Sequence, residues 1–514
     1  MTGRSLFRSR RWRVLRWAGL AAAVPALWAC NSRSLEPPII SPTSTYKNTF
    51  QETINRKIDI LFMIDNSSSM ELSQANLVRN LTTFMNVLKG LPDGLPDVHI
   101  AVVTSDMGAG DGSITGCGGN GNGGVFQFSP RTPQGGTACT DTTLQNGAHY
   151  ISDTGGAAPQ TNFTSPDITT VFQCIAPVGA SGCGFEHQLA SVARALGADG
   201  QGAPPQENQD FLRDSAYLAI IFITNEDDCS APVNSMLFDT ASNTNLASTV
   251  GPPGNFRCNE FGHTCSLNGA ASAPPARLSP MPTDLTQMVS YDNCVSSETT
   301  GLLTPIAQFA QGIKGLKADP ASQILVASIQ GPVTPYTVHW TAPPTSDTGP
   351  WPSIEHSCTA TDSSFADPGV RMQQFVQQFG GNGLTTSICA DNFGPALNTI
   401  AMKLSALIGP KCIVGTVATR SGSTTIPDCT VTDVVPSASG GGNSQSVVAA
   451  CADNGNTPPC WDLVAGSGMM CNGSHVITIN RGGVMPPDNL RNAVECSMCL
   501  GNPPAPPDPT RSCL

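Results

Sequence analysis

The segment Lys57–Met70 reads KIDILFMIDNSSSM, an apolar run that ends in one carboxylate and a row of hydroxyls. In a tight loop, the alternating residues Asp65, Ser67 and Ser69 can turn their side chains the same way. Carboxylate and hydroxyl oxygens are hard ligands that suit Mg²⁺, which keeps several waters and takes few protein charges. We therefore interpret this loop as a candidate divalent-cation site, which would accept a carboxylate as its last ligand.

A second interpretation of the same serines needs no cation. Ser67 to Ser69 directly precede a helix that is predicted to begin near Glu71, and Ser is a preferred residue at helix N-caps. Capping and cation binding are compatible, so the sequence leaves both open.

The elements around this loop alternate along the chain. Short apolar runs predict strands and helical periodicity predicts helices, at 58–64, 71–89, 98–103, 185–196, 217–223, 302–317, 323–329, 370–379 and 393–408. Strands that are apolar throughout and alternate with helices indicate a parallel sheet covered on both faces. The predicted fold class is therefore α/β, a doubly wound and mostly parallel sheet with long disulfide-bridged insertions, plus a small Cys-rich β domain.

The pattern Asp65-x-Ser67-x-Ser69 after an apolar strand and before an amphipathic helix resembles the metal-ion-dependent adhesion site (MIDAS) of von Willebrand factor type A (VWA) domains. The resemblance implies bound Mg²⁺, or Ca²⁺ or Mn²⁺, and a protein partner that offers an Asp or Glu carboxylate. The family's Thr ligand is missing from the loop Gly182–Glu186, and Asn225 stands where the family's last Asp is expected. The implied ligand set is Asp65, Ser67, Ser69, Glu186, Asn225 and Asp227.

These departures from the family pattern leave alternatives open. More carboxylates and flexible loops favour Ca²⁺ over the smaller Mg²⁺. The site could also have lost its metal, and Glu226–Asp228 could be a solvated acidic turn at a strand end.

The first 29 residues are typical of a secretory signal. Six arginines precede an apolar stretch that is too short to favour a membrane span. Leu27-Trp28-Ala29-Cys30 resembles a bacterial lipobox, which implies a lipid on Cys30, general secretory export and a place in the outer membrane or at the cell surface. The alternative is an ordinary signal cleaved near Ala29. Together with the TSDMG, GCGFE, EDDCS and SICADNF segments, the lipobox resembles bacterial lipoproteins that carry a VWA domain.

The cysteines favour an oxidising compartment. Besides Cys30 there are 18, ten in the range 117–389 and eight in the range 412–513, so two separately bridged regions are predicted. We expect disulfides rather than a zinc or redox site at Cys496-x-x-Cys499. We expect a disulfide between Cys258 and Cys265 rather than a zinc cluster of Cys258, His263 and Cys265.

Composition narrows the function classes. The formal net charge is −12 and becomes −18 without the six signal arginines, which argues against nucleic acid as a partner. No HExxH, Walker-type, GxGxxG or GxSxG motif is present where it would have a mechanism, so the sequence predicts no enzyme.

The predicted organisation is a signal peptide at 1–29, a lipid-anchored tether at 30–52, a VWA-like domain at 53–411 and a Cys-rich β domain with a Pro-rich tail at 412–514. In the last part, only the stretch around Leu490 to Cys496 has a helical period. The first functional hypothesis is a cell-envelope module for cation-dependent protein binding or adhesion. The first alternative is a disulfide-stabilised envelope scaffold without metal, and the less favoured one is a secreted hydrolase.

Overall fold

The computed structural model describes residues 45–514 except 52–55, 92–93, 111–113, 115, 133–137, 141, 157, 233, 241–245, 252–253, 255, 270–274, 276, 278–287, 300–301, 342–350, 409–411, 436–442, 467–470, 472, 483–489, 502–503 and 508. The predicted signal peptide, Cys30 and most of the tether lie outside the described residues. No helix of the described part is long and apolar enough to cross a membrane.

A six-stranded sheet forms the centre of the α/β part, in the order β13-β8-β5-β2-β3-β4. Five of the strands are parallel, and β4 pairs antiparallel to β3. This arrangement confirms the predicted mostly parallel sheet. The strands are β2 (Lys57–Ile64), β3 (Asp97–Thr104), β4 (Ile151–Asp153), β5 (Tyr217–Ile223), β8 (Ile324–Gln330) and β13 (Gly383–Ser387).

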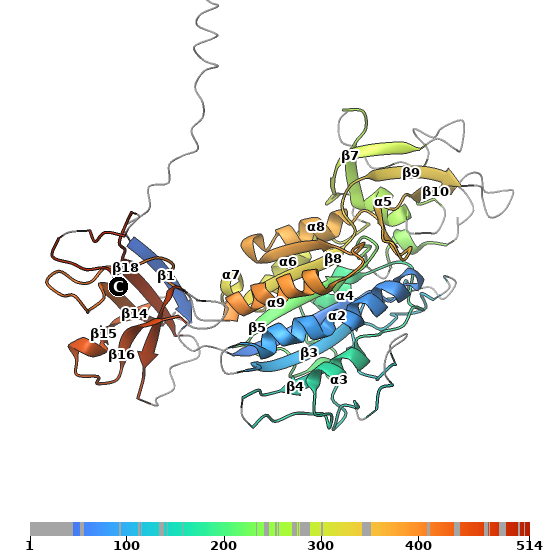
Figure 1. The fold of residues 1–514 in the computed structure, drawn as a ribbon. Coiled ribbons are helices and arrows are strands. Elements are labelled where there is room, and N and C mark those ends of the chain that lie inside the picture. The colour runs from blue at the N-terminus through green and yellow to red at the C-terminus, as the bar shows by residue number, and fades with distance from the viewer. Residues whose placement is uncertain are drawn as a thin grey trace, which may run out of the picture. The chain divides into compact units, whose positions relative to one another are not determined.

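Helices cover both faces of the sheet (Figure 1), which is why the central strands are apolar throughout. In β2, Ile60 and Phe62 belong to the core under one face, whereas Leu61 and Met63 belong to the core under the other. The first face packs against α2 (Glu71–Lys89), α3 (Ile168–Ile175) and α9 (Gly394–Ile408), and the second against α4 (Gln188–Ala195), α6 (Ile306–Lys314) and α8 (Val370–Gln377).

The strand order reverses at β2. From β2 the chain passes through α2 to β3 on one side, and it later returns to form β5 on the other side of β2. In open parallel sheets, ligands bind outside the carboxyl ends of the strands at such a switch point. Here the residues after β2 and β5 occupy that position.

Insertions after β5 and β8 build a second, antiparallel sheet in the order β10-β9-β7-β6 (Figure 1). Its core contains the buried rings of Tyr291, Tyr336 and Trp340. The elements are α5 (Phe256–Gly262), β6 (His263–Ser266), β7 (Val289–Ser296), β9 (Tyr336–Thr341) and β10 (Trp351–Ile354), and a short hairpin follows, β11 (Cys358–Thr359) with β12 (Phe365–Ala366).

Nine disulfides join the 18 cysteines, five in the first group and four in the second, as the even counts predicted. The predicted Cys258–Cys265 pairing is wrong, because Cys258 pairs with Cys229 and Cys265 with Cys294. Spacing in sequence does not decide such pairings, since each half-cystine meets its partner only in the folded insertion.

The C-terminal part is rich in strands and cysteines. Strands β14 (Cys429–Val435), β15 (Ser444–Ala450), β16 (Cys460–Ala465) and β17 (His475–Asn480) lie next to one another in that order. The expected helical turn at Leu490 to Cys496 is wrong, because Arg491–Ser497 forms β18. Part of the predicted tether is ordered as well: Thr45–Gln51 forms β1 beside β18.

Contacts along the backbone divide the chain into two compact units. One includes Gly415–Cys429 and Glu495–Leu514, and the other includes Asn48–Val414 and Thr430–Val494. The domain boundaries proposed from the sequence stay predictions.

Candidate functional site

The loop after β2 places Asp65 at the carboxyl edge of the sheet. The Asp65 amide donates to the Ile223 carbonyl of β5 at 3.0 Å, which extends the strand pairing by one residue. The side chain is fully buried, and its Oδ1 accepts the Ser67 amide at 2.8 Å. The two hydroxyls come together, with Ser67 Oγ 3.1 Å from Ser69 Oγ. The structure thus brings Asp65, Ser67 and Ser69 together as predicted.

These serines do not cap a helix through their side chains. Ser67 is the N-cap of a 3₁₀ turn at Ser68–Met70, yet its hydroxyl makes no capping hydrogen bond. Met70 precedes α2 and has no capping side chain either. Ser67 therefore occupies an N-cap position without the side-chain hydrogen bond that the capping interpretation requires, and the hydroxyls of Ser67 and Ser69 lie close to each other instead.

The loop after β5 contributes further polar side chains beside Asp65, Ser67 and Ser69, and together these residues form a polar cluster. Thr224 Oγ1 donates to Asp65 Oδ2 at 2.7 Å. Asn225 lies against Ser69, whose Oγ is 3.0 Å from its Nδ2 and 3.2 Å from its Oδ1. The backbone of the β11–β12 hairpin holds this amide in place, because Asn225 Nδ2 also donates to the Phe365 carbonyl at 3.1 Å. The structure brings Asn225 into the cluster as the resemblance implied.

Glu186 completes the cluster from the segment that leads into α4. Ser105, the first residue after β3, donates its hydroxyl to Glu186 Oε2 at 2.5 Å and lies 3.4 Å from Asp65 Oδ1. Glu186 is 1% exposed, and its second oxygen, Oε1, has no hydrogen-bond partner among the described residues. A buried carboxyl oxygen without a partner costs free energy unless a ligand satisfies it.

The pKa values of Asp65 and Glu186 reflect the same lack of groups that would compensate a buried negative charge. Burial, and then the negative charges of Asp65 and Glu226, raise the pKa of the Glu186 carboxyl well above its usual range. Burial likewise raises the pKa of Asp65, although the Ser67 amide and the Thr224 hydroxyl oppose it. Within the described part of the chain, no Lys or Arg forms an ion pair with either carboxyl.

The cluster contains oxygen donors of the kind that a hard divalent cation prefers. It has two carboxyls, the hydroxyls of Ser67 and Ser69, and the amide of Asn225. Across the described residues, three or more His, Cys, Asp or Glu side chains do not gather into a metal-binding group. A cation here would therefore depend on hydroxyl, amide and water oxygens as well as carboxylates, a mixture that suits Mg²⁺ or Ca²⁺ better than softer metals.

Asp227 is engaged elsewhere. Its carboxylate accepts the amides of Arg371 and Met372 at 2.8 and 3.0 Å and lies 2.7 Å from His263 Nε2. Burial raises its pKa, but these hydrogen bonds outweigh burial and hold the pKa below the ordinary value. None of its hydrogen bonds reaches the other predicted ligands, so the structure does not bring Asp227 into the cluster.

Two hydroxyl residues of the cluster, Ser105 and Thr224, were not predicted as site residues. Each directly follows a parallel strand, β3 or β5, and that position is the sequence signal that could have identified them. A lone Ser or Thr after a strand has no distinctive spacing, whereas Asp65-x-Ser67-x-Ser69 does.

A cleft of about 240 Å³ opens beside the cluster. Glu71 and Gln74 of α2 line one part of it, and Arg131, Pro177 and Gly179 line another. Gln74 joins cleft and cluster, because its Nε2 donates to the Asp65 carbonyl at 2.9 Å and to the Gly179 carbonyl at 2.8 Å.

Comparison with protein-family models gives no match, and comparison with curated proteins gives none either. Among solved structures, the pilus adhesin SpaC from Lactobacillus rhamnosus GG is 11% identical with a TM-score of 0.26, over 88% of this chain and 40% of that chain. The vWF domain of the type V pili tip protein Mfa5 from Porphyromonas gingivalis is 13% identical with a TM-score of 0.28, over 69% of this chain and 97% of that chain.

An aerotolerance-related membrane protein from Bacteroides fragilis is also similar, at 10% identity and a TM-score of 0.23, over 68% of this chain and 98% of that chain. Scores this low do not establish a shared fold. The assignment of a doubly wound α/β fold therefore rests on the strand order and on the helices that cover both faces.

Proposed function

We propose that this protein is a cell-envelope module that binds a protein partner with the help of a divalent cation. Asp65, Ser67, Ser69, Asn225 and Glu186 would hold the cation, which would be Mg²⁺, Ca²⁺ or Mn²⁺. The observation that carries the proposal is the buried pair of carboxyls, Asp65 and Glu186, which has no Lys or Arg counter-charge among the described residues. No group of the described chain donates to Glu186 Oε1, and the two carboxyls can hydrogen-bond each other only through a proton of their own.

Access to the cluster supports binding of a partner group. Ser69 is half-buried and its neighbour Ser68 is exposed, so solvent reaches the cluster on the Ser69 side, whereas Asp65, Ser67 and Glu186 are buried. A bound cation supplies an electrophile to which an external Asp or Glu carboxylate can attach. The chain itself contributes a fixed set of oxygens around that position.

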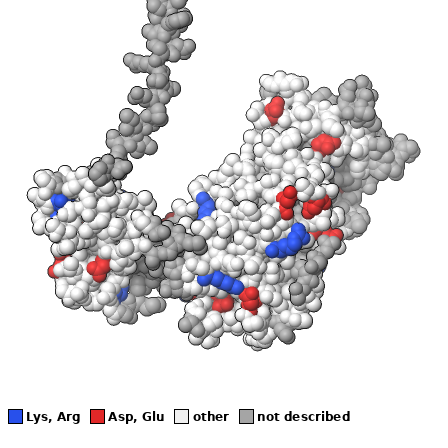
Figure 2. Space-filling model, in the orientation of Figure 1, with Lys and Arg blue, Asp and Glu red and all other residues white. Residues whose placement is uncertain are grey.

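We propose that recognition is local to the cluster and its cleft. Figure 2 shows Lys, Arg, Asp and Glu side chains scattered among uncharged ones on the face drawn, without a continuous patch of one sign. The cleft beside Gln74 gives a place for a side chain next to the partner's carboxylate, with Glu71 and Arg131 on its lining. We propose adhesion or protein binding at the cell surface, with a lipid on Cys30 as the anchor and no catalysis.

A second candidate is a structural scaffold without a cation. The nine disulfides favour it, because bridges on this scale stabilise an envelope protein whether or not it binds metal. In that case the Glu186 proton would take the place of the cation by joining the two carboxyls.

Calorimetric titration separates the two candidates. Mg²⁺, Mn²⁺ and Ca²⁺ are titrated into the chain from Asn31 onward and into its Asp65→Ala variant. Saturable binding in the parent that is lost in the variant supports the proposed function. Equal heats from both proteins, or no heat, would leave the scaffold as the better description.

A further inference from the structure

We propose that Asp227 and Asp228 are positioning residues, through which the disulfide-bridged insertion between β5 and β8 sets the geometry of the candidate cation site. They fix the loop after β5 and the start of α4, and these two segments carry Asn225 and Glu186. The inference rests on the proposed function, since it concerns the same site.

Asp227 ties the loop to α8 and to the insertion. Its carboxylate accepts the amides of Arg371 and Met372 in the first turn of α8. Its Oδ2 also lies 2.7 Å from His263 Nε2 in β6, and His263 Nδ1 lies 2.8 Å from the Tyr336 hydroxyl in β9. All of these side chains are buried, so a chain of hydrogen bonds runs from the loop into the second sheet.

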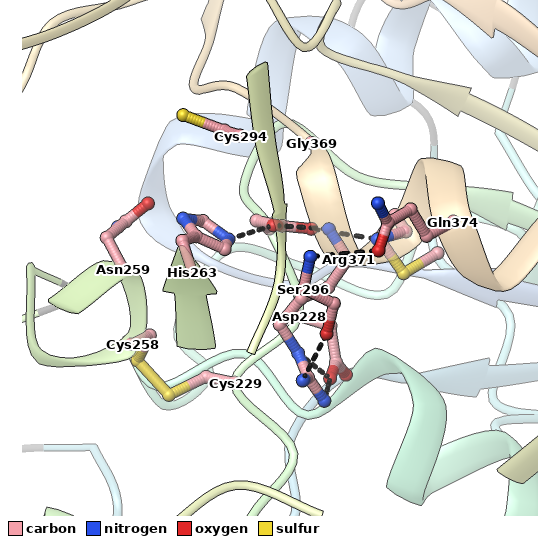
Figure 3. Close-up of polar contacts among 12 residues, drawn as sticks. Asp228, Cys229, Cys258, Asn259, His263, Cys294, Ser296, Gly369, Arg371 and Gln374 are labelled. Carbon is pink, nitrogen blue, oxygen red and sulfur yellow. Dashed lines mark hydrogen bonds and ion pairs between the residues drawn. A yellow bond between two sulfur atoms is a disulfide. The ribbon is translucent and has the colours of Figure 1, made fainter. Parts of the chain in front are cut away.

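Asp228 ties the same loop to α4 and to a buried arginine. Its Oδ1 accepts the Leu189 amide at 3.0 Å, in the first turn of α4. Its Oδ2 lies 3.0 Å from Nη2 and 3.2 Å from Nε of Arg371, which is fully buried (Figure 3). Charge-assisted bonds of this geometry are among the stronger polar contacts in a protein interior.

Arg371 in turn depends on the insertion. Its Nη1 donates to Ser296 Oγ of β7 at 3.0 Å, and its Nη2 donates to the Thr304 carbonyl at 2.8 Å (Figure 3 shows the Ser296 contact). The Ser296 amide donates to Gln374 Oε1 of α8 at 2.8 Å. The Cys229–Cys258 disulfide adds a covalent link between the loop and α5.

The loop and the start of α4 are also joined directly. The Cys229 amide donates to the Glu186 carbonyl at 2.7 Å. Gln188 Nε2 donates to Thr224 Oγ1 at 3.0 Å and to the Glu226 carbonyl at 3.2 Å. A shift of the loop would therefore move Asn225 and Glu186 together.

The charges distinguish these two acids from the cluster. Asp228 has a guanidinium partner, and Asp227 has helix-terminal amides and an imidazole, whereas Asp65 and Glu186 have no such partner among the described residues. Outer residues that orient metal ligands commonly change metal affinity by about tenfold to a hundredfold when they are removed. Asp227 and Asp228 have the contacts of such outer residues.

The first experiment measures Mn²⁺ affinity by calorimetry in the chain from Asn31 onward and in the variants Asp227→Asn and His263→Leu. We expect both variants to bind Mn²⁺ about tenfold more weakly. The matched control is Asp59→Asn, which removes another buried, hydrogen-bonded carboxylate, near the start of β2, and should leave the affinity within about twofold of the parent. Among the described residues, the hydrogen bonds and ion pairs of Asp59 go to Arg213, Lys317 and His99 and not to the loop after β5.

His263→Leu decides between positioning and direct ligation, because the side-chain hydrogen bonds of His263 reach the cluster only through Asp227. If Asp227→Asn abolished binding and His263→Leu left it unchanged, Asp227 would be a ligand and the inference would be overturned. Parental affinity in both variants, or an equal loss in the Asp59→Asn control, would overturn it too.

A second measurement does not need the cation. Hydrogen exchange of cation-free His263→Leu should be faster than in the parent for peptides that cover 183–190 and 224–230, and unchanged for peptides that cover β2. Unchanged exchange in both loops overturns the inference, even if the parent binds Mn²⁺. No Mn²⁺ binding by the parent would instead remove the proposed function and with it the consequence for affinity.

Discussion

Strand β2 has a buried carboxylate at each end, and the two carboxylates have different partners. Asp59, near its start, is bonded by the Arg213 amide at 2.7 Å and by Arg213 Nε at 2.8 Å, and Lys317 Nζ lies 3.9 Å away. Asp65 lies just after the end of β2, and among the described residues its polar neighbours are hydroxyls, one backbone amide and a second carboxyl. Both side chains are fully buried.

The difference separates a structural charge from a binding charge. A buried charge is tolerated when an opposite charge and hydrogen bonds compensate it. At Asp59 the chain supplies that compensation itself, even though burial still raises the pKa of this carboxyl to about 6. At Asp65 the compensation has to come from a proton or from a bound cation, which is what a site that exchanges ligands requires.

The largest effect is a loss of stability that we expect when Asp59 loses its Arg213 partner. In Arg213→Met, Asp59 would lose the guanidinium that pairs with it at 2.8 Å, so we expect the unfolding free energy to fall by about 3 kcal/mol or more. Urea denaturation of the parent and the variant at pH 7 measures the loss. The control is Arg194→Met, which removes a looser pair with Asp199 at 3.5 Å and should cost under about 1 kcal/mol. Equal losses in both variants would contradict the comparison.

His187, which follows Glu186 in the sequence, should make the stability of the protein depend on pH. His187 is fully buried, neither ring nitrogen has a hydrogen-bond partner among the described residues, and burial lowers its pKa to about 4. Because the unfolded chain takes up a proton near its ordinary pKa of about 6.5 and the folded chain does not, stability contributed by the neutral ring is lost as the pH falls from about 6.5 to 4. The full loss is about 3 kcal/mol, of which about 2 kcal/mol is reached at pH 5.

His187→Phe tests this, since Phe is neutral at every pH and the ring would pack against Phe238 as His187 does. Urea denaturation at pH 7 and pH 5 should show a smaller drop in unfolding free energy for the variant than for the parent. His99 is a partly buried histidine whose pKa burial also lowers to about 4, but it is present in both proteins and cancels in the difference. A drop of the same size in both proteins would mean that His187 does not titrate as described.

The next largest effect is the stabilisation of the folded chain by a cation bound at Asp65. A ligand that binds only the folded chain stabilises it by about 2.7 kcal/mol at one hundred times its Kd. Thermal unfolding of the parent in Mn²⁺ and in EDTA should show this increase, and Asp65→Asn should show none. The same shift in the variant would place the cation at another position.

Sequence reasoning predicted the central sheet because its signal is local. The buried strands 58–64 and 217–223 and the helix 71–89 appear at or within a residue of the predicted spans. Edge strand β13 was missed because its Gly-Leu-Thr-Thr-Ser sequence is half-buried and not apolar. The second sheet was missed because its strands pair across long insertions that have no repeating pattern.

The site residues could be predicted where they share one loop or follow neighbouring strands of the sheet. Asp65, Ser67 and Ser69 share one loop, and Asn225 follows the strand that neighbours β2. Asp227 was wrongly grouped with them, because two residues further along the loop the chain has turned toward the start of α8. Glu186 was placed by analogy, and its lack of a counter-charge could only be seen once the surrounding side chains were in place.

The smallest effect is the sharpest test of the comparison. In EDTA, Asp65→Asn removes an uncompensated charge while one amide oxygen remains to accept the Ser67 amide, so we expect unfolding free energy to change by less than about 1 kcal/mol in either direction. Asp59→Asn, the same substitution at the other end of β2, breaks an ion pair and should cost more. If Asp65→Asn proves as destabilising as Asp59→Asn, then Asp65 is a structural residue with a compensating partner. If it is neutral in EDTA yet abolishes the stabilisation by Mn²⁺, the chain retains this carboxylate for what it binds and not for how it folds.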